Sequence, residues 1–398
     1  MRAEPILRSR IMGGQSWFQA WVESVAGPGS LSATSLSCSA RPRPSRLGFG
    51  TSGLMGSAIT TAGRLRLLEV ALDEGITHFD TAPLYGAGLA EEMLGRFAKG
   101  KRHSVTITTK FGLLPRQIPL PLRPLLPMAR LARRGLRRFR PKAAAGSGYG
   151  GPLKLEAPQP PGASGGSHGQ VADPRLNPAA TVSVPPSSLQ LPVSAEALRQ
   201  QLHTSLRKLK CDYVDFYLLH DCGPADVTDS AVAALESLVQ EGKIRSWGVA
   251  TGRWGSRQIL EGRPDFAGVV QIPDHLLRRD TAWFAHHAPP PLFSHSALRQ
   301  GLADPTAVDP IVERLVGRWA RYTGRAGADP ALLSEILLLG GLHNNPQGCV
   351  IFSSGRAERI GANARILRRW GGEIPELAAM LAEEIQASDQ GADDVSGC

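Results

Sequence analysis

Four residues whose side chains can hold or move a proton stand at the ends of short apolar segments. Asp80 ends one such segment, and Tyr85 follows it after a few residues. Lys110 ends the next segment, and His220 directly follows a third. If these segments are neighbouring parallel strands, their carboxyl ends share one rim, so we expect the four side chains to meet there.

These four side-chain types together suit acid catalysis on a carbonyl group. A tyrosine phenol has an ordinary pKa near 10 and is a weak acid at neutral pH. A neighbouring ammonium stabilises the phenolate, and a carboxylate keeps that ammonium charged and in place. We therefore predict Tyr85 as the general acid, with Lys110 as its activator and Asp80 as the partner of the lysine. His220 then orients the carbonyl and helps to relay its proton. None of these groups supplies electrons, so a hydride must come from a cofactor.

Each residue taken alone also has an ordinary structural interpretation. A single aspartate near a strand end is most often a turn or cap residue. A lysine there is usually solvated, and a tyrosine near a loop usually packs with its hydroxyl in water. A single histidine is more often structural than catalytic. The placement of all four at one end of three successive strands favours the catalytic interpretation.

Eight short apolar segments alternate with helical sequence along the chain. The predicted strands are Leu47–Gly50, Thr77–Asp80, Val105–Lys110, Tyr213–Leu219, Ile244–Ala250, Gly268–Ile272, Leu292–His295 and Cys349–Ser353. The predicted helices include Gly63–Glu74, Leu89–Ala98, one that begins after an N-cap at Ser194, and Ser230–Gln240. Eight such units predict an α/β fold of the (β/α)8 TIM-barrel type. An open doubly wound sheet would need a Gly-x-Gly-x-x-Gly fingerprint after the first strand, and residues 47–53 lack that spacing.

Composition divides the chain into a barrel and its appendages. Residues 1–45 read as a flexible extension, 46–386 as the barrel, and 387–398 as a disordered tail. A long Pro/Gly/Arg-rich insertion, 111–192, follows the third strand. Nine basic residues and no acidic one lie between 111 and 142, which accounts for nearly all of the net charge of +10. The remainder is close to neutral, which argues against a protein built throughout to bind nucleic acid.

The insertion has two parts of different character. Within 125–140, apolar residues at helical spacing alternate with arginines, which predicts a basic amphipathic helix. Such a helix suits a lid, an anionic partner or a membrane surface, although a solvated loop is the simpler interpretation. The tract 143–186 has too few apolar residues to offset the entropy lost on ordering, so we expect it to be disordered.

The cysteines and the apolar segments mainly exclude certain kinds of site and of location. The five cysteines are scattered, without metal-ligand spacing, so we predict free thiols and neither a disulfide framework nor a metal site. No apolar run is long enough to span a membrane, and the N-terminus lacks the apolar core of a secretory signal. We therefore expect a cytoplasmic protein.

The segments around the four residues resemble the aldo-keto reductase family. The stretch Gly75-Ile-Thr-His-Phe-Asp-Thr-Ala-Pro-Leu-Tyr-Gly86 is similar to the family's first signature, and Asp212-Tyr-Val-Asp-Phe-Tyr-Leu-Leu-His220 to its second. The resemblance spans Arg46–Leu113 and Val193–Ile374, or 250 of the 398 residues. It implies a (β/α)8 barrel that uses NADP(H), or less often NAD(H), to interconvert a carbonyl (aldehyde, ketone or sugar) and an alcohol.

The same resemblance implies a set of cofactor-binding residues. Gln271 matches the position that contacts the nicotinamide carboxamide. The loop along the pyrophosphate is matched by Ser296, Leu298 and Gln300. The segment at the adenosine 2′-phosphate is matched by Ser354, Arg356, Arg359 and Asn363. Planar guanidinium groups suit phosphate oxygens, which favours NADP(H) over NAD(H).

Two departures from the family pattern leave an alternative open. Ala250 and Thr251 stand where the family usually has Ser-Asn. After Gln271 the family often has an aromatic residue that stacks on the nicotinamide, but here Pro273 and Asp274 follow. The alternative is a catalytically weakened binding or regulatory protein that retains the scaffold.

Overall fold

The computed structural model describes most of the predicted barrel. The described residues are 43–54, 60–115, 188–278, 281–288, 291–298, 308–325, 329 and 331–395. The predictions for the N-terminal extension up to residue 42, for the basic helix within 125–140 and for Gln300 therefore lie outside the described residues. No helix in the described part of the chain is long and apolar enough to cross a bilayer.

Eight parallel strands form a closed barrel in the order β1-β10-β9-β8-β7-β6-β3-β2. Their bounds are β1 Leu47–Gly50, β2 His78–Asp80, β3 Thr106–Phe111, β6 Val214–His220, β7 Ile244–Ala250, β8 Val269–Pro273, β9 Phe293–His295 and β10 Cys349–Phe352. All eight predicted strands are present, with ends that differ by at most one residue. The (β/α)8 barrel is confirmed.

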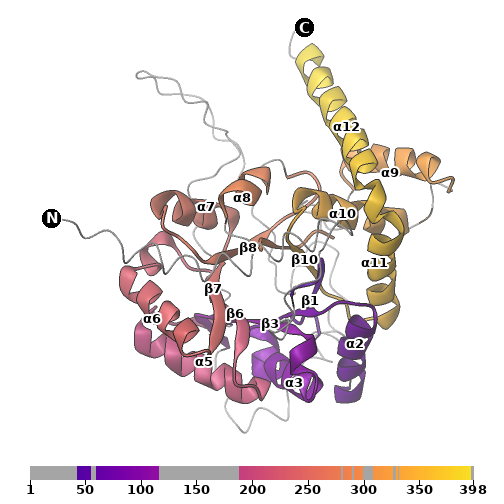
Figure 1. Ribbon diagram of the computed structural model, residues 1–398. Coiled ribbons are helices and arrows are strands. Elements are labelled where there is room, and N and C mark those ends of the chain that lie inside the picture. Colours follow the sequence, from indigo (N-terminus) through magenta and orange to yellow (C-terminus); the bar gives the residue numbers. More distant parts are fainter. Residues whose placement is uncertain are drawn as a thin grey trace, which may run out of the picture.

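Helices surround the barrel on its outside (Figure 1). Their bounds are α2 Thr61–Asp73, α3 Leu89–Ala98, α5 Ala195–Leu209, α6 Asp229–Gln240, α7 Arg253–Gly262, α8 Thr281–His287, α9 Pro310–Tyr322, α10 Ala331–Asn344, α11 Ala357–Trp370 and α12 Ile374–Val395. The predicted N-cap is present, because Ser194 Oγ accepts a hydrogen bond from the Ala197 N–H at 3.2 Å. Leu198 and Leu202 of the same helix are fully buried, as their spacing predicts.

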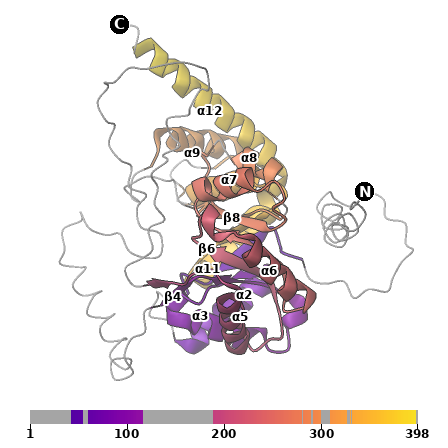
Figure 2. The ribbon, with the colours of Figure 1, turned by 90° about the vertical axis from the view of Figure 1, so that its left-hand side faces the viewer.

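Helix α12 is longer than the sequence suggested. We expected a disordered tail from 387 onward, but the helix continues to Val395. Leu377 and Leu381 are buried, and Glu384 accepts a hydrogen bond from the Arg314 Nε–H at 2.6 Å. Contacts with α9 therefore fix the first turns, and the helix then extends away from the barrel (Figure 2).

The two ends of the predicted insertion pair with each other. Strand β4 (Leu113–Pro115) and strand β5 (Ser188–Gln190) form an antiparallel pair. The Leu191 N–H also donates to the Gly112 carbonyl at 2.7 Å. The chain therefore leaves the barrel and returns to it at one place, directly after strand β3. The predicted insertion over 111–192 did not include this ordered base.

The barrel interior contains a histidine among apolar side chains. His78 Nδ1 lies 2.9 Å from Thr106 Oγ1, and its Nε2 lies 3.3 Å from Thr108 Oγ1. The imidazole stacks on Phe293 with ring centres 4.8 Å apart. Burial, with a smaller contribution from the Lys110 ammonium, lowers the pKa of His78 to about 3. His78 is therefore neutral near pH 7.

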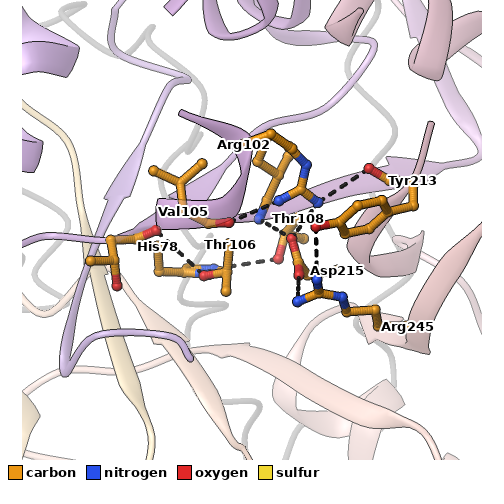
Figure 3. Close-up of polar contacts among 10 residues, drawn as sticks. His78, Arg102, Val105, Thr106, Thr108, Tyr213, Asp215 and Arg245 are labelled. Carbon is orange, nitrogen blue, oxygen red and sulfur yellow. Dashed lines mark hydrogen bonds and ion pairs between the residues drawn. The ribbon is translucent and has the colours of Figure 1, made fainter. Parts of the chain in front are cut away.

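An ionic cluster lies at the amino-terminal end of the barrel (Figure 3). Asp215 Oδ2 accepts hydrogen bonds from Arg102 Nη2 at 2.6 Å and from the Ile107 N–H at 2.8 Å. Its Oδ1 lies 2.5 Å from Arg245 Nη1. The centre of the Tyr213 ring lies 4.0 Å from Arg102 Cζ and 4.5 Å from Arg245 Cζ. Buried charges at this end of a TIM barrel serve stability, because the chemistry occurs at the opposite end.

Removing the Asp215 carboxylate should destabilise the protein strongly. Asp215→Ala leaves two guanidinium groups facing each other, so we expect the free energy of unfolding to fall by on the order of 3 kcal/mol. Chemical denaturation measures this loss. The control is Asp229→Ala, whose exposed carboxylate pairs with Arg263 and should cost less than about 1 kcal/mol. Equal losses in the two variants would contradict the structural role of the cluster.

His78 should make the folded state sensitive to acid. Its folded pKa lies below the ordinary 6.5, so the unfolded chain binds an extra proton between these two values and stability falls as the pH falls. Between pH 7 and pH 5, the lowered pKa of His78 reduces the free energy of unfolding by about 2 kcal/mol. We expect His78→Asn to lose that much less stability than wild type over the same interval, measured by urea denaturation at both pH values. An unchanged pH dependence would rule the effect out.

Candidate functional site

The structure brings the four predicted side chains together at the carboxyl end of the barrel. Asp80 is the last residue of β2, and His220 is the last residue of β6. Strand β3 lies between them and pairs with both, with Lys110 opposite Leu218 of β6. Three adjacent strands therefore place the Asp80 carboxylate, the Lys110 amine and the His220 imidazole at one rim of the barrel, as expected.

A buried ion pair forms the base of this site. The Lys110 ammonium donates to Asp80 Oδ1 at 2.6 Å and to the Thr81 carbonyl at 3.1 Å. The two charged side chains are only 2% and 5% exposed. Burial lowers the pKa of Lys110, whereas the carboxylates of Asp80 and Asp221 act in the opposite direction. The two acceptors and the burial of the side chain therefore hold the ammonium in place.

Tyr85 lies over this ion pair. Its ring centre is 5.2 Å from Lys110 Nζ, and its ring meets that of His220 edge to face, with centres 6.2 Å apart. Tyr85 begins a 3-10 turn in which Gly86 and Ala87 have φ angles of 58° and 60°. This left-handed backbone directly follows Tyr85, five residues after the end of β2.

His220 contributes a neutral ring to the site. Burial lowers the pKa of His220 well below its ordinary 6.5, and the positive charges of Lys110 and His295 lower it further. Its Nδ1 is buried and has no hydrogen-bond partner among the described residues. His295, which the sequence did not single out, ends β9 on the far side of the barrel mouth. A neutral imidazole can take part in hydrogen bonding without adding a second cation beside Lys110.

Two polar side chains at the ends of β7 and β8 carry unsatisfied atoms. The Gln271 amide donates to Asp80 Oδ1 at 3.1 Å, which joins the predicted carboxamide-binding residue to the ion pair. Its Oε1 is buried without a hydrogen-bond partner among the described residues, and so is Thr251 Oγ1. Gln271 pairs in register with Ala250, the residue before Thr251. Buried polar atoms of this kind are normally satisfied by a ligand or water.

The other predicted cofactor residues follow β9 and β10 or lie on α11. Ser296 has a left-handed backbone with φ of 71°, and its hydroxyl lies 2.9 Å from His295 Nδ1. Leu298 packs against the hydrophobic core. Neither residue contacts the ion pair directly, so the structure leaves their predicted roles open.

The predicted phosphate-binding residues gather at the beginning of α11. The Arg356 N–H donates to Ser354 Oγ at 3.1 Å at this end of the helix. The side chains of Arg356 and Arg359 are exposed, and neither forms an ion pair with another described residue. Asn363, one turn further on, is buried. A helix N-terminus with free guanidinium groups suits an anion.

Asp274, one of the departures from the family pattern, has its side chain among the helices outside the barrel. Asp274 is buried behind the strand, where its Oδ1 accepts from Thr281 Oγ1 at 2.7 Å and lies 3.4 Å from both Arg253 Nη1 and Asn344 Nδ2. These partners belong to the surrounding helices α7, α8 and α10. The alternation of side chains along β8 predicts this direction, because Gln271 faces inward and a residue three positions later faces outward.

Asp221 is a further polar residue at the rim. It directly follows His220 and has a left-handed backbone, with φ of 50°. Burial raises the pKa of Asp221 to about 6, although the Lys110 ammonium acts in the opposite direction. The only sequence feature that could have singled out Asp221 is its position as a charged residue directly after the predicted strand.

The buried ion pair should show strong energetic coupling. Asp80→Asn leaves the Lys110 ammonium without its carboxylate, so we expect a loss of about 3 kcal/mol of unfolding free energy. The double variant Asp80→Asn/Lys110→Met removes both charges and should recover part of that loss, with a coupling energy of roughly 2 kcal/mol. Denaturation of the wild type, both single variants and the double variant measures the cycle. Strictly additive losses would contradict a directly coupled pair.

Comparison with known proteins gives a matching family model and similar oxidoreductases. The sequence model described as the Aldo/keto reductase family matches residues 46–138 and 182–304, which is more than half of the chain. A Glycine max protein named "Probable aldo-keto reductase 1" is 24% identical over 210 residues, which covers 52% of this chain and 41% of that protein. "Uncharacterized oxidoreductase YqkF" of Bacillus subtilis is 25% identical over 189 residues, covering 48% and 40%. The chain thus spans about two fifths of the length of these curated relatives.

Solved structures share the fold at low sequence identity. A glycerol dehydrogenase from Gluconobacter oxydans superposes with a TM-score of 0.55 at 17% identity, covering 86% of this chain and 93% of that one. An aldo-keto reductase from Klebsiella pneumoniae, solved in complex with NADPH, has a TM-score of 0.51 at 21% identity, covering 85% and 91%. These likenesses agree with the barrel described above.

Proposed function

The chain belongs to the aldo/keto reductase family, as its sequence motifs indicated, and from this premise we propose that it is an NAD(P)H-dependent oxidoreductase that interconverts a small carbonyl compound and its alcohol. The observation that carries the proposal is the buried Lys110 ammonium, which lies between Asp80 and the Tyr85 ring. That arrangement fits an acid and base able to act on a carbonyl oxygen at neutral pH.

The protein side of the proposed reaction is a proton transfer. A nicotinamide cofactor, when bound, supplies or accepts the hydride. In the reductive direction the Tyr85 phenol donates its proton to the carbonyl oxygen, and the Lys110 ammonium favours the phenolate that remains. In the oxidative direction the same phenolate accepts the proton of the alcohol. The neutral His220 ring forms a hydrogen bond with the reacting oxygen and so orients it.

The residues at the strand ends fit a nicotinamide group. Gln271 Oε1 and Thr251 Oγ1 are buried acceptors without partners among the described residues, and a carboxamide offers two N–H donors. Thr251 therefore provides a polar atom where the family usually has asparagine. We infer that these two side chains hold the carboxamide close to the ion pair that Gln271 already contacts.

The beginning of α11 supports NADP(H) in preference to NAD(H). Arg356 and Arg359 place two exposed guanidinium groups there, and planar guanidinium groups bind phosphate oxygens with two parallel hydrogen bonds. Ser354 and Asn363 complete this proposed 2′-phosphate site. Ser296, Leu298 and Gln300 remain the residues proposed along the pyrophosphate. The Klebsiella pneumoniae relative was solved with NADPH, in agreement with this preference.

Replacing the phenol should abolish turnover without abolishing cofactor binding. We expect Tyr85→Phe to lower kcat/KM for NADPH-dependent reduction of a panel of aldehydes and ketones by about 100-fold or more, because the general acid is lost. The dissociation constant for NADPH, measured by fluorescence, should change little. Loss of NADPH absorbance over time reports the turnover.

Tyr322→Phe serves as the matched control, because Tyr322 is exposed and its hydroxyl bonds to Glu373 far from the barrel mouth. Its activity should equal that of wild type. A Tyr85→Phe variant as active as wild type would exclude Tyr85 as the acid. A wild type that binds NADPH but reduces none of the panel would favour the alternative, a binding or regulatory protein on this scaffold.

A further inference from the structure

We propose that Glu91 is a positioning residue, which holds the turn that carries Tyr85 in a defined place relative to Lys110. This inference rests on the proposed function, because it assumes that Tyr85 acts as the acid and Lys110 as its activator. The buried carboxylate of Glu91 takes no part in the proposed reaction itself. Its contacts instead connect the two elements on which those residues lie.

The position of Tyr85 depends on helix α3. Its turn, Tyr85–Gly88, runs directly into α3, which begins at Leu89. The Leu89 N–H donates to the carbonyls of Tyr85 and Gly86. Because the turn and the helix are continuous, a displacement of the beginning of α3 would also displace the phenol.

Glu91 connects the beginning of α3 to strand β3. It is the third residue of the helix, and its side chain is fully buried. Its Oε1 accepts a hydrogen bond from Thr109 Oγ1 at 2.8 Å. Thr109 directly precedes Lys110, and side chains alternate along a strand, so the threonine faces α3 while the lysine faces the barrel mouth. The hydrogen bond therefore attaches the helix to β3 at the residue next to Lys110.

Lys208 of α5 contacts both the carboxylate and the turn. Its Nζ lies 3.7 Å from Glu91 Oε2, and a Cβ atom added at Gly88 would lie 2.5 Å from the same Nζ. Gly88 has a φ of 87°, a conformation that favours glycine. A Cβ at Gly95 would lie 2.5 Å from the Lys208 carbonyl oxygen, so α3 and α5 also pack closely. The ammonium therefore fills the space between Glu91 and the last residue of the turn.

Burial of the Glu91 carboxylate is not the arrangement that stability alone would favour. Its side chain is fully buried, whereas that of Lys208 is 31% exposed. Burial raises the pKa of Glu91, although Ser205, Lys208 and Thr109 act in the opposite direction. Apolar residues of similar volume are often at least as stabilising as a buried ion pair. A directional hydrogen bond, by contrast, defines the distance between the helix and the strand.

A double variant separates positioning from stability. Thr109→Val and Glu91→Met each leave one polar partner buried without the other, so both should destabilise the chain. Thr109→Val/Glu91→Met replaces both partners by apolar groups and should recover most of that stability. We nevertheless expect its kcat for NADPH-dependent reduction of the aldehyde panel to lie roughly 10-fold below wild type, with an unchanged dissociation constant for NADPH. Glu91→Gln keeps an acceptor for Thr109 and should stay close to wild type.

The pH profile of alcohol oxidation gives a second measurement. The Tyr85 phenolate is the form that accepts the proton of the alcohol, and the Lys110 ammonium favours that form. A displaced turn should therefore move the rise of kcat to higher pH in the double variant. A purely structural role for Glu91 would leave this profile unchanged once stability is recovered.

Two matched variants serve as controls. Glu335→Gln changes another buried glutamate, which accepts from Trp319 Nε1 at 2.5 Å between α9 and α10. Thr106→Val removes another buried hydroxyl from β3, one that lies against His78. Both controls should keep the kcat and the pH profile of wild type. A double variant with recovered stability and with wild-type kcat and pH profile would overturn the proposal.

A wild type inert toward every aldehyde would remove the proposed function but leave the positioning role open to a direct test. Tyrosinate absorbance, measured as the difference between each chain and its Tyr85→Phe derivative, then follows the ionisation of Tyr85 alone. Ionisation at higher pH in the double variant than in wild type would support the proposal. Ionisation at the same pH in both would refute it.

Discussion

A lysine ammonium buried in the mouth of a barrel must have a charged partner, and the arrangement around the site satisfies this requirement. Lys110 reaches Asp80 and the Thr81 carbonyl only because β2 and β3 are adjacent and in the observed register. The same aspartate accepts from Gln271 on the opposite side of the barrel. Closure of the eight strands therefore adds a hydrogen bond from across the barrel to the ion pair, and an unpaired charge at this depth would cost several kcal/mol.

Clusters of polar and charged side chains lie at both ends of the barrel. At the amino-terminal end, the Asp215 carboxylate pairs with two arginines and accepts from a backbone N–H, and these contacts help to hold strands together. At the carboxyl-terminal end, polar atoms of His220, Gln271 and Thr251 remain without partners among the described residues. These open hydrogen-bonding positions fit the proposed placement of cofactor and substrate.

The fold and the four central residues could be predicted because their signals are local. Each strand is an apolar run, and Asp80, Lys110 and His220 are polar residues at the ends of such runs. Features that depend on tertiary contacts were harder to predict. The pairing of β4 with β5 involves segments separated by more than 70 residues, and α12 continues past residue 386 from a base packed on α9. The left-handed turn at Asp221 depends on Ala250 and Gln190, which no local pattern connects to it.

Titration of the purified full chain with NADPH and NADH in parallel, monitored by cofactor fluorescence, tests whether this barrel mouth is a nicotinamide-dependent redox site. We expect saturable binding of one NADPH per chain and weaker binding of NADH, because Arg356 and Arg359 form no ion pair with another described residue at the beginning of α11. Failure of both cofactors to give saturable binding would contradict a nicotinamide site in this barrel.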